Sequence, residues 1–141
     1  MPMLHSGINA VADRLPKVLT PKSHAIADYA WIGGFGLMGA LLWNRNRRAA
    51  IAALACSGVG AAVALLTDYA GGVAGKVDLH DHARIEMGLS AVASSLPGFL
   101  GFGDEPEARL FRAMGKASTL ATAFTDFGRR GVRRRQWKRA S

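Results

Sequence analysis

Residues 49–67 form a long stretch without a charged side chain, and this stretch limits what the chain can fold into more than any other feature. A helix of about 20 predominantly apolar residues crosses a hydrocarbon layer of roughly 30 Å. Residues 25–43 form a second such stretch, in which Asp28 is the one charged residue. Residues 87–103 are uncharged but shorter, and Pro97 is expected to kink a helix there. These three stretches predict membrane-spanning helices.

Two further segments have a weaker helical pattern. Residues 107–127 contain Arg109, Arg112 and Lys116. A basic side chain at mid-depth costs a few kcal/mol unless the bundle shelters it or it reaches the surface. We interpret this segment as a fourth spanning helix, with a partly submerged amphipathic helix as the alternative. In residues 1–19 apolar side chains recur every three or four positions, which predicts a short amphipathic helix lying in the membrane interface.

The distribution of basic residues predicts how the chain is oriented. Lys and Arg number 18 against 10 Asp and Glu, and the densest basic cluster is in residues 129–141. The excess lies mostly on the side of both termini, so the positive-inside bias places both termini in the cytoplasm of a multi-pass inner-membrane protein. The basic tail is expected to contact anionic lipid headgroups. No nucleic-acid partner is expected, because the basic residues are not interleaved with stacking aromatics.

Two parts of the chain, about residues 20–70 and 78–128, carry the same polar residues at the same spacing. Each contains a histidine, an acidic residue four positions later, and a Thr-Asp pair after a long apolar segment. A shift of 58 residues relates His24, Asp28, Thr67 and Asp68 to His82, Glu86, Thr125 and Asp126. Residues 20 and 78, both good N-cap types, obey the same shift. The sequence therefore predicts an all-α, four-helix transmembrane bundle over residues 20–128, built from two tandem helical hairpins in parallel.

These polar residues are the candidate site. Residues four apart share a helix face, so each His and its acidic partner open a helix on the cytoplasmic side, where the two Thr-Asp pairs end the returning helices. Asp68 and Asp126 at helix C-termini would need a compensating cation. Two imidazoles and four carboxylates in a four-helix bundle are the ligand set of di-iron and di-manganese carboxylate proteins. We therefore predict a transition metal, namely iron, manganese or zinc, bound by His24, Asp28, Asp68, His82, Glu86 and Asp126.

Other interpretations of the cluster stay open. Lys22, Arg84 and backbone groups could satisfy it, so that it only sets the register of the helices in a structural or partner-binding membrane module. Two histidines at equal depth could also be the axial ligands of one haem. No reaction or substrate is predicted, since the chain has no convincing Ser/His/Asp order, phosphate-binding glycine loop or zinc-type cysteine spacing. The sequence leaves both a single chain and an assembly of identical copies open.

Four segments also carry a resemblance to known proteins: "TPKSHAIADY", "LLTDYAGG", "HARIEMGLS" and "LPGFLGFGDEPEA". The chain resembles small bacterial membrane proteins with a His-to-acid spacing in their odd helices and a Thr-Asp-Tyr step after the second. It is loosely similar to the SPW-repeat family, with "SSLPGFLGF" in place of the Ser-Pro-Trp and Gly-Phe stretch. This resemblance covers roughly residues 20–128. It implies a four-helix membrane protein and no particular activity.

Overall fold

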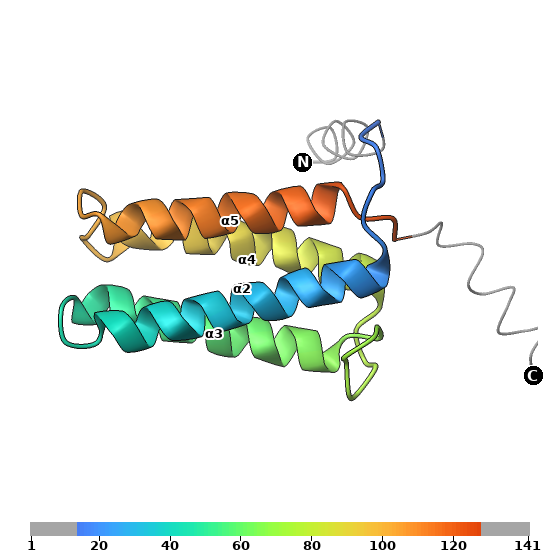
Figure 1. Cartoon of the computed structure of the whole chain (residues 1–141), viewed down its shortest axis with the longest axis horizontal. Coiled ribbons are helices and arrows are strands. Elements are labelled where there is room, and N and C mark those ends of the chain that lie inside the picture. Colours follow the sequence, from blue (N-terminus) through green and yellow to red (C-terminus); the bar gives the residue numbers. More distant parts are fainter. Residues whose placement is uncertain (1–13, 128–141) are drawn as a thin grey trace, which may run out of the picture.

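The computed structural model describes residues 14–127, which form four α-helices and no β-strand. The all-α prediction with four helices is confirmed. Residues 14–19 are not helical, and the rest of the predicted interfacial helix at 1–19 and the basic tail at 129–141 lie outside the described residues. The helices are α2 (Pro21–Leu42), α3 (Arg47–Leu66), α4 (Leu79–Phe99) and α5 (Glu107–Ala123) (Figure 1).

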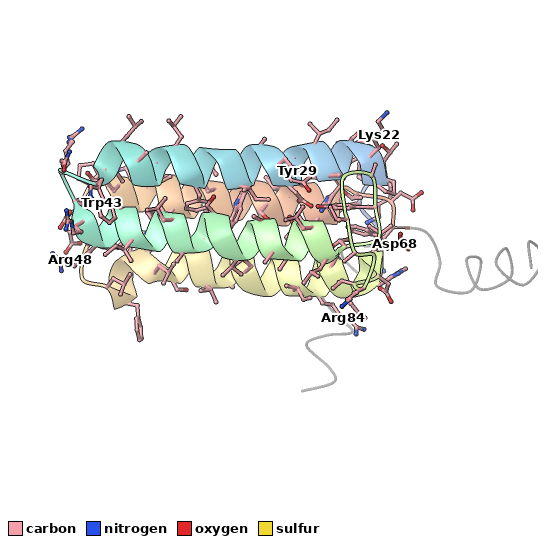
Figure 2. The ribbon with its side chains drawn as sticks, turned by 90° about the horizontal axis from the view of Figure 1, so that it is seen from below. Lys22, Tyr29, Trp43, Arg48, Asp68 and Arg84 are labelled. Atoms are coloured by element: carbon pink, nitrogen blue, oxygen red, sulfur yellow. The ribbon has the colours of Figure 1, made fainter. Side chains whose placement is uncertain are left out.

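The helices form two hairpins that pack side by side into a bundle. The helix α2 packs mainly on α3 and α4 on α5, while α2 with α5 and α3 with α4 make the contacts between the hairpins. Both hairpin turns lie at one end of the bundle, and the 67–78 connection lies at the other end (Figure 1). Trp43 and Arg48 mark the first end, and Lys22, Asp68 and Arg84 mark the second (Figure 2). The helices α2 and α4 therefore both start at the second end.

Side-chain caps fix where these two helices start. The hydroxyl of Thr20 accepts a hydrogen bond from the Ser23 amide at the start of α2. At the start of α4, the carboxylate of Asp78 accepts from the amides of His80 and Asp81. Each cap satisfies amide groups that have no partner within the helix. Because the caps stand 58 residues apart, His24 and His82 occupy the same position in their helices.

The helix α4 departs from the predicted 87–103 segment at both ends. It begins at Leu79, directly after the Asp78 cap, and contains Pro97 near its end. Gly101 has a φ of 75°, and the Phe102 amide bonds to the carbonyl of Pro97 at 2.8 Å. This is a Schellman arrangement, which glycine permits at positive φ. The turn ends the helix at Phe99 instead of residue 103. Likewise α5 ends at Ala123, earlier than the predicted 127.

The core of the bundle combines aromatic rings with small residues. Phe35 contacts Trp31 and Phe111 at ring-centroid distances of 4.5 and 5.2 Å, and Phe111 contacts Phe102 at 5.3 Å. The buried face of α3 consists of small residues. A Cβ added at Gly60, on that face, would meet the Trp31 ring at 2.9 Å. The helices α2 and α3 therefore approach closely where the Trp31 ring lies over Gly60.

Two of the four helices, α2 and α3, are long and apolar enough to cross a membrane by length and composition. Large apolar side chains are also exposed on all four helices. Examples from α2 to α5 are Leu37, Leu41, Ile51, Val59, Ile85, Val92, Leu110 and Leu120. The shorter α5 carries the three basic residues noted in the sequence.

Candidate metal centre

Four ionisable side chains meet inside the bundle, in about the first two turns of α2 and α4. The exposed fractions are 0% for His24, 8% for Asp28, 2% for His82 and 9% for Glu86. One donor atom from each lies within 4.8 Å of the donor atoms of the other three. The i, i+4 spacing puts each His and its acidic partner on one helix face, and the two faces are directed toward each other. The structure therefore brings together four of the six predicted ligands.

The Nε2 atoms of both histidines face both carboxylates. Nε2 of His24 lies 2.9 Å from Oε2 of Glu86 and 3.3 Å from Oδ1 of Asp28. Nε2 of His82 lies 3.1 Å from Oδ2 of Asp28 and 3.7 Å from Oε2 of Glu86. Ligands bound tetrahedrally at about 2.1 Å from an ion are about 3.4 Å apart. The four nitrogen-to-oxygen separations bracket that value.

A threonine hydroxyl binds the other nitrogen of each ring. Nδ1 of His24 lies 2.8 Å from Oγ1 of Thr125, and Nδ1 of His82 lies 2.8 Å from Oγ1 of Thr67. Each pair joins the two hairpins, because each histidine and its threonine come from different ones. The 58-residue shift relates His24 to His82 and Thr67 to Thr125, so the two pairs are equivalent. The two histidines are thus held in equivalent ways.

The hydroxyl protons show that Nδ1 of each ring carries a proton. Thr67 donates to the carbonyl of Val63 at 2.6 Å, and Thr125 donates to the carbonyl of Ala121 at 2.5 Å. A hydroxyl has one proton to donate, so each threonine oxygen accepts from the Nδ1–H of its histidine. A neutral ring with Nδ1–H has its lone pair on Nε2. In their neutral forms, both histidines therefore direct lone pairs at the carboxylates.

The Nε2 atom of His82 shows the consequence of this arrangement. This atom is buried and makes no hydrogen bond among the described residues, although Oδ2 of Asp28 is 3.1 Å away. A buried polar atom without a partner is uncommon in native structures. A lone pair beside a carboxylate oxygen is repulsive unless a proton or a metal ion lies between them.

Hydroxyl groups hold the carboxylates. Ser118 donates to Oε1 of Glu86 at 2.8 Å, and Thr122 donates to Oε2 at 2.6 Å. Tyr69 donates to Oδ2 of Asp28 at 2.8 Å. Burial and this hydrogen bond raise the pKa of Tyr69, so its hydroxyl stays protonated and remains a donor. These hydrogen bonds orient the carboxylate oxygens, as the hydrogen-bond partners of metal ligands commonly do.

The two halves of the site differ on the side of α3. The 58-residue shift relates Ser118 and Thr122, the donors to Glu86, to Gly60 and Ala64, which have no hydroxyl. Asp28 instead receives the Tyr69 hydroxyl from the connection after α3. The residue equivalent to Tyr69 is Phe127, whose ring lies 5.3 Å from that of His24. The site is therefore symmetric at its histidines and asymmetric at its carboxylates.

Asp68 and Asp126 lie apart from this cluster. The helices end at Leu66 and Ala123, before the two aspartates, and both aspartates are exposed. Their amides bond to the carbonyls of Val77 and Leu19 in equivalent bridges. Since the chain is no longer helical there, each Thr side chain turns into the bundle and the following Asp turns out. The threonines, rather than the aspartates, of the two Thr-Asp pairs belong to the site.

The structure also bears on the two other interpretations of the cluster. Lys22 and Arg84 are exposed, and within residues 14–127 Asp28 and Glu86 form ion pairs with the histidines. Hydroxyl groups, not these basic side chains, satisfy the cluster. The His24 and His82 rings contact each other at a centroid distance of 5.5 Å and face the same carboxylates, an arrangement that supports one shared ion more than the haem interpretation.

Comparisons of the chain with protein-family models, curated proteins and solved structures gave no match. The geometry of the site therefore carries the functional argument.

Proposed function

We propose that this chain is a small integral membrane protein that binds one transition metal ion between His24, Asp28, His82 and Glu86. The observation that carries the proposal is that Nδ1 of each histidine binds a threonine, which leaves both Nε2 atoms facing the two carboxylates. Both Nδ1–H groups are committed to threonine hydroxyls whose own protons bind backbone carbonyls. When the rings are neutral, both therefore aim Nε2 lone pairs into a buried space lined by two carboxylates. A divalent cation there removes the repulsion and balances the two negative charges.

The donor set supports particular metals. Mixed imidazole and carboxylate ligands suit zinc, iron and manganese, whereas magnesium and calcium prefer oxygen ligands alone. The one cysteine, Cys56, belongs to the hydrophobic core and is not in the cluster. A thiolate-based copper(I) or zinc site is therefore not proposed. With four protein donors in place of six, the proposed centre holds one ion instead of a di-metal pair.

The exposed apolar surface supports the membrane part of the proposal. Both α2 and α3 pass the length and composition criteria for a span, and exposed apolar side chains continue around α4 and α5. The described chain enters α2 and leaves α5 at the end of the bundle with Lys22 and Arg84 (Figure 2), and the sequence that follows, residues 129–141, is basic. The positive-inside bias then places this end, and the metal centre near it, on the cytoplasmic side of the inner membrane. The tail would contact anionic lipid there.

A second function has its own supporting observation. The bonds from His24 to Thr125 and from His82 to Thr67 join the two hairpins. With both rings protonated, the two imidazolium groups balance the two carboxylates without an ion. The cluster would then fix the register of the hairpins in a structural membrane module. The two proposals differ in whether the purified protein contains metal.

The experiment measures the metal content of protein purified in detergent from cells grown with ample iron, manganese and zinc. We expect about one ion per chain in the wild type and almost none in the His24→Ala/His82→Ala double variant. His80→Ala is the matched control, because His80 lies on α4 outside the cluster. Metal-free wild type that takes up none of the three ions on titration would contradict the metal proposal and favour the structural one.

A further inference from the structure

A groove lies between α4 and α5 on the surface of the second hairpin, apart from the metal centre. Its volume is about 440 Å³, within the range of about 300–1,000 Å³ that is usual for small-molecule sites. The buried residues Ser90 and Gly115 form its floor, and exposed or half-buried residues form its walls. The complete lining is Met87, Ser90, Ala91, Ser94, Gly115, Lys116, Thr119 and Leu120.

The floor of the groove lies where the second hairpin departs from the first. The 58-residue shift relates Ser90 to Ile32 and Gly115 to Ser57. In the first hairpin, the Ser57 hydroxyl donates to the carbonyl of Ile32 at 2.8 Å, so this side chain bridges the two helices. In the second hairpin, both floor residues are smaller than their counterparts, which favours a hollow at this position.

Ser90 places an unused hydroxyl in the floor. It is 2% exposed, and its Oγ makes no hydrogen bond among the described residues. A helical serine often donates to the carbonyl four residues earlier, as Ser95 does to Ala91 at 2.8 Å. A buried hydroxyl without a partner is unfavourable. A ligand atom that accepts a hydrogen bond from Ser90 would remove this cost.

Lys116 adds a positive charge to the same groove. It is exposed near the middle of α5, and its ammonium forms no ion pair within residues 14–127. A lysine at mid-depth in a membrane is costly unless it finds a partner. The exposed acidic residues of this part of the chain lie in the first turns of helices or in the connections. A second copy seated on the groove would therefore bring no carboxylate to Lys116, whereas an anionic ligand would.

We propose that the groove binds a fatty acid, with its carboxylate held by Lys116 and Ser90 and its hydrocarbon chain on the apolar wall of Met87, Ala91 and Leu120. This proposal goes beyond the metal function and does not depend on it. One carboxylate balances one ammonium, and its two oxygens accept from both the ammonium and the hydroxyl. A phospholipid is less suitable, because its phosphate stays at the membrane surface while Lys116 lies near mid-helix.

The test measures binding of cis-parinaric acid, a fluorescent fatty acid, to the full chain in a non-ionic detergent. We expect saturable binding to the wild type and a Kd about tenfold higher in Lys116→Gln, because a charge-assisted hydrogen bond is lost. The methyl ester of the probe, which has no charge, should lose a similar factor with the wild type. Arg109→Gln is the matched control, since it removes a charge from an exposed residue of α5 outside the groove; it should bind like the wild type.

Two more variants test the floor and the wall of the groove. Ser90→Ala should weaken binding but leave the unfolding temperature of the ligand-free protein unchanged, because its hydroxyl has no partner within the described chain. Ala91→Phe fills the groove from an exposed position and should abolish saturable binding. Val92→Phe is the matched control, because Val92 is exposed on α4 and does not line the groove.

The outcomes separate this proposal from the metal site. Lys116→Gln should keep the metal content of the wild type, because Lys116 is outside the cluster, so either site can fail alone. Equal Kd values for the acid and its ester, or for the wild type and Lys116→Gln, overturn recognition of a carboxylate. A wild type without saturable binding overturns the proposal outright. If cross-linking then detects a dimer that Ala91→Phe disrupts, the groove is an interface between copies instead.

Discussion

His82 donates from Nδ1 to the hydroxyl of Thr67 at 2.8 Å, and this bond ties the start of α4 to the end of α3. The same relationship joins His24 to Thr125 across 101 residues. Because both threonines use their protons on backbone carbonyls, they act on the histidines only as acceptors. They set which nitrogen of each ring faces the site.

Replacing the threonines should therefore weaken metal binding. Thr67→Val or Thr125→Val removes the acceptor for Nδ1–H and frees the ring to change tautomer, and such outer partners commonly contribute about 10- to 100-fold to metal affinity. Competition with a chelator of known affinity measures the loss. Thr119→Val is the matched control, since Thr119 makes the same backbone bond, to Gly115, outside the site. Equal losses in Thr119→Val and Thr67→Val would contradict a specific role.

The affinity for metal should fall as the pH falls. A metal ion and a proton compete for the Nε2 lone pairs of His24 and His82, so binding releases protons and acid opposes it. Where the histidines are protonated in the free protein, the apparent affinity should drop about tenfold per pH unit for each proton displaced. Chelator competition from pH 5.5 to 8 measures the slope. His82→Ala should reduce the slope by about one proton and His80→Ala should not; an affinity independent of pH would contradict histidine ligation.

Tyr69→Phe should show what the Tyr69 hydroxyl contributes. Phe127 occupies the equivalent position beside His24, so the variant should fold. Loss of the hydrogen bond to Asp28 should lower the free energy of unfolding by about 1 to 3 kcal/mol. The pKa of Tyr69 is raised in the folded state, so the wild type keeps this advantage below about pH 10 and loses it above, where the unfolded chain ionises first. Thermal unfolding of both proteins at pH 8 and pH 11 measures the difference, which should shrink at pH 11.

The sequence was sufficient to predict four helices and the meeting of His24, Asp28, His82 and Glu86, because helical periodicity fixes the face of each pair. It was insufficient at the helix ends. Whether Thr67 or Asp68 turns inward depends on α3 ending at Leu66. Hydrophobic periodicity does not predict the last residue of a helix. Both Thr-Asp pairs are present in the sequence, where the charge of the aspartates predicts ligands and the threonines carry no such signal.

The remaining members of the site could not be predicted from spacing. Ser118 and Thr122 lie among many small residues of α5, and their distance from Glu86 depends on how α5 packs against α4. Tyr69 reaches Asp28 from the irregular 67–78 connection. The one available signal was the departure from the repeat, since Gly60 and Ala64 stand where Ser118 and Thr122 stand in the second copy.

Val59→Lys tests whether the bundle lies in a membrane. Val59 is on α3 and is 50% exposed. In a bilayer a lysine near the middle of a span costs about 2.5 to 3.5 kcal/mol, whereas an exposed position in water usually tolerates the change within about 0.5 kcal/mol. We expect Val59→Lys to reduce the amount of protein recovered in the membrane fraction after alkaline extraction. Val73→Lys, at an 82% exposed position in the 67–78 connection, should leave that amount unchanged. Wild type found in the soluble fraction without detergent, and matched there by Val59→Lys, would contradict the membrane proposal.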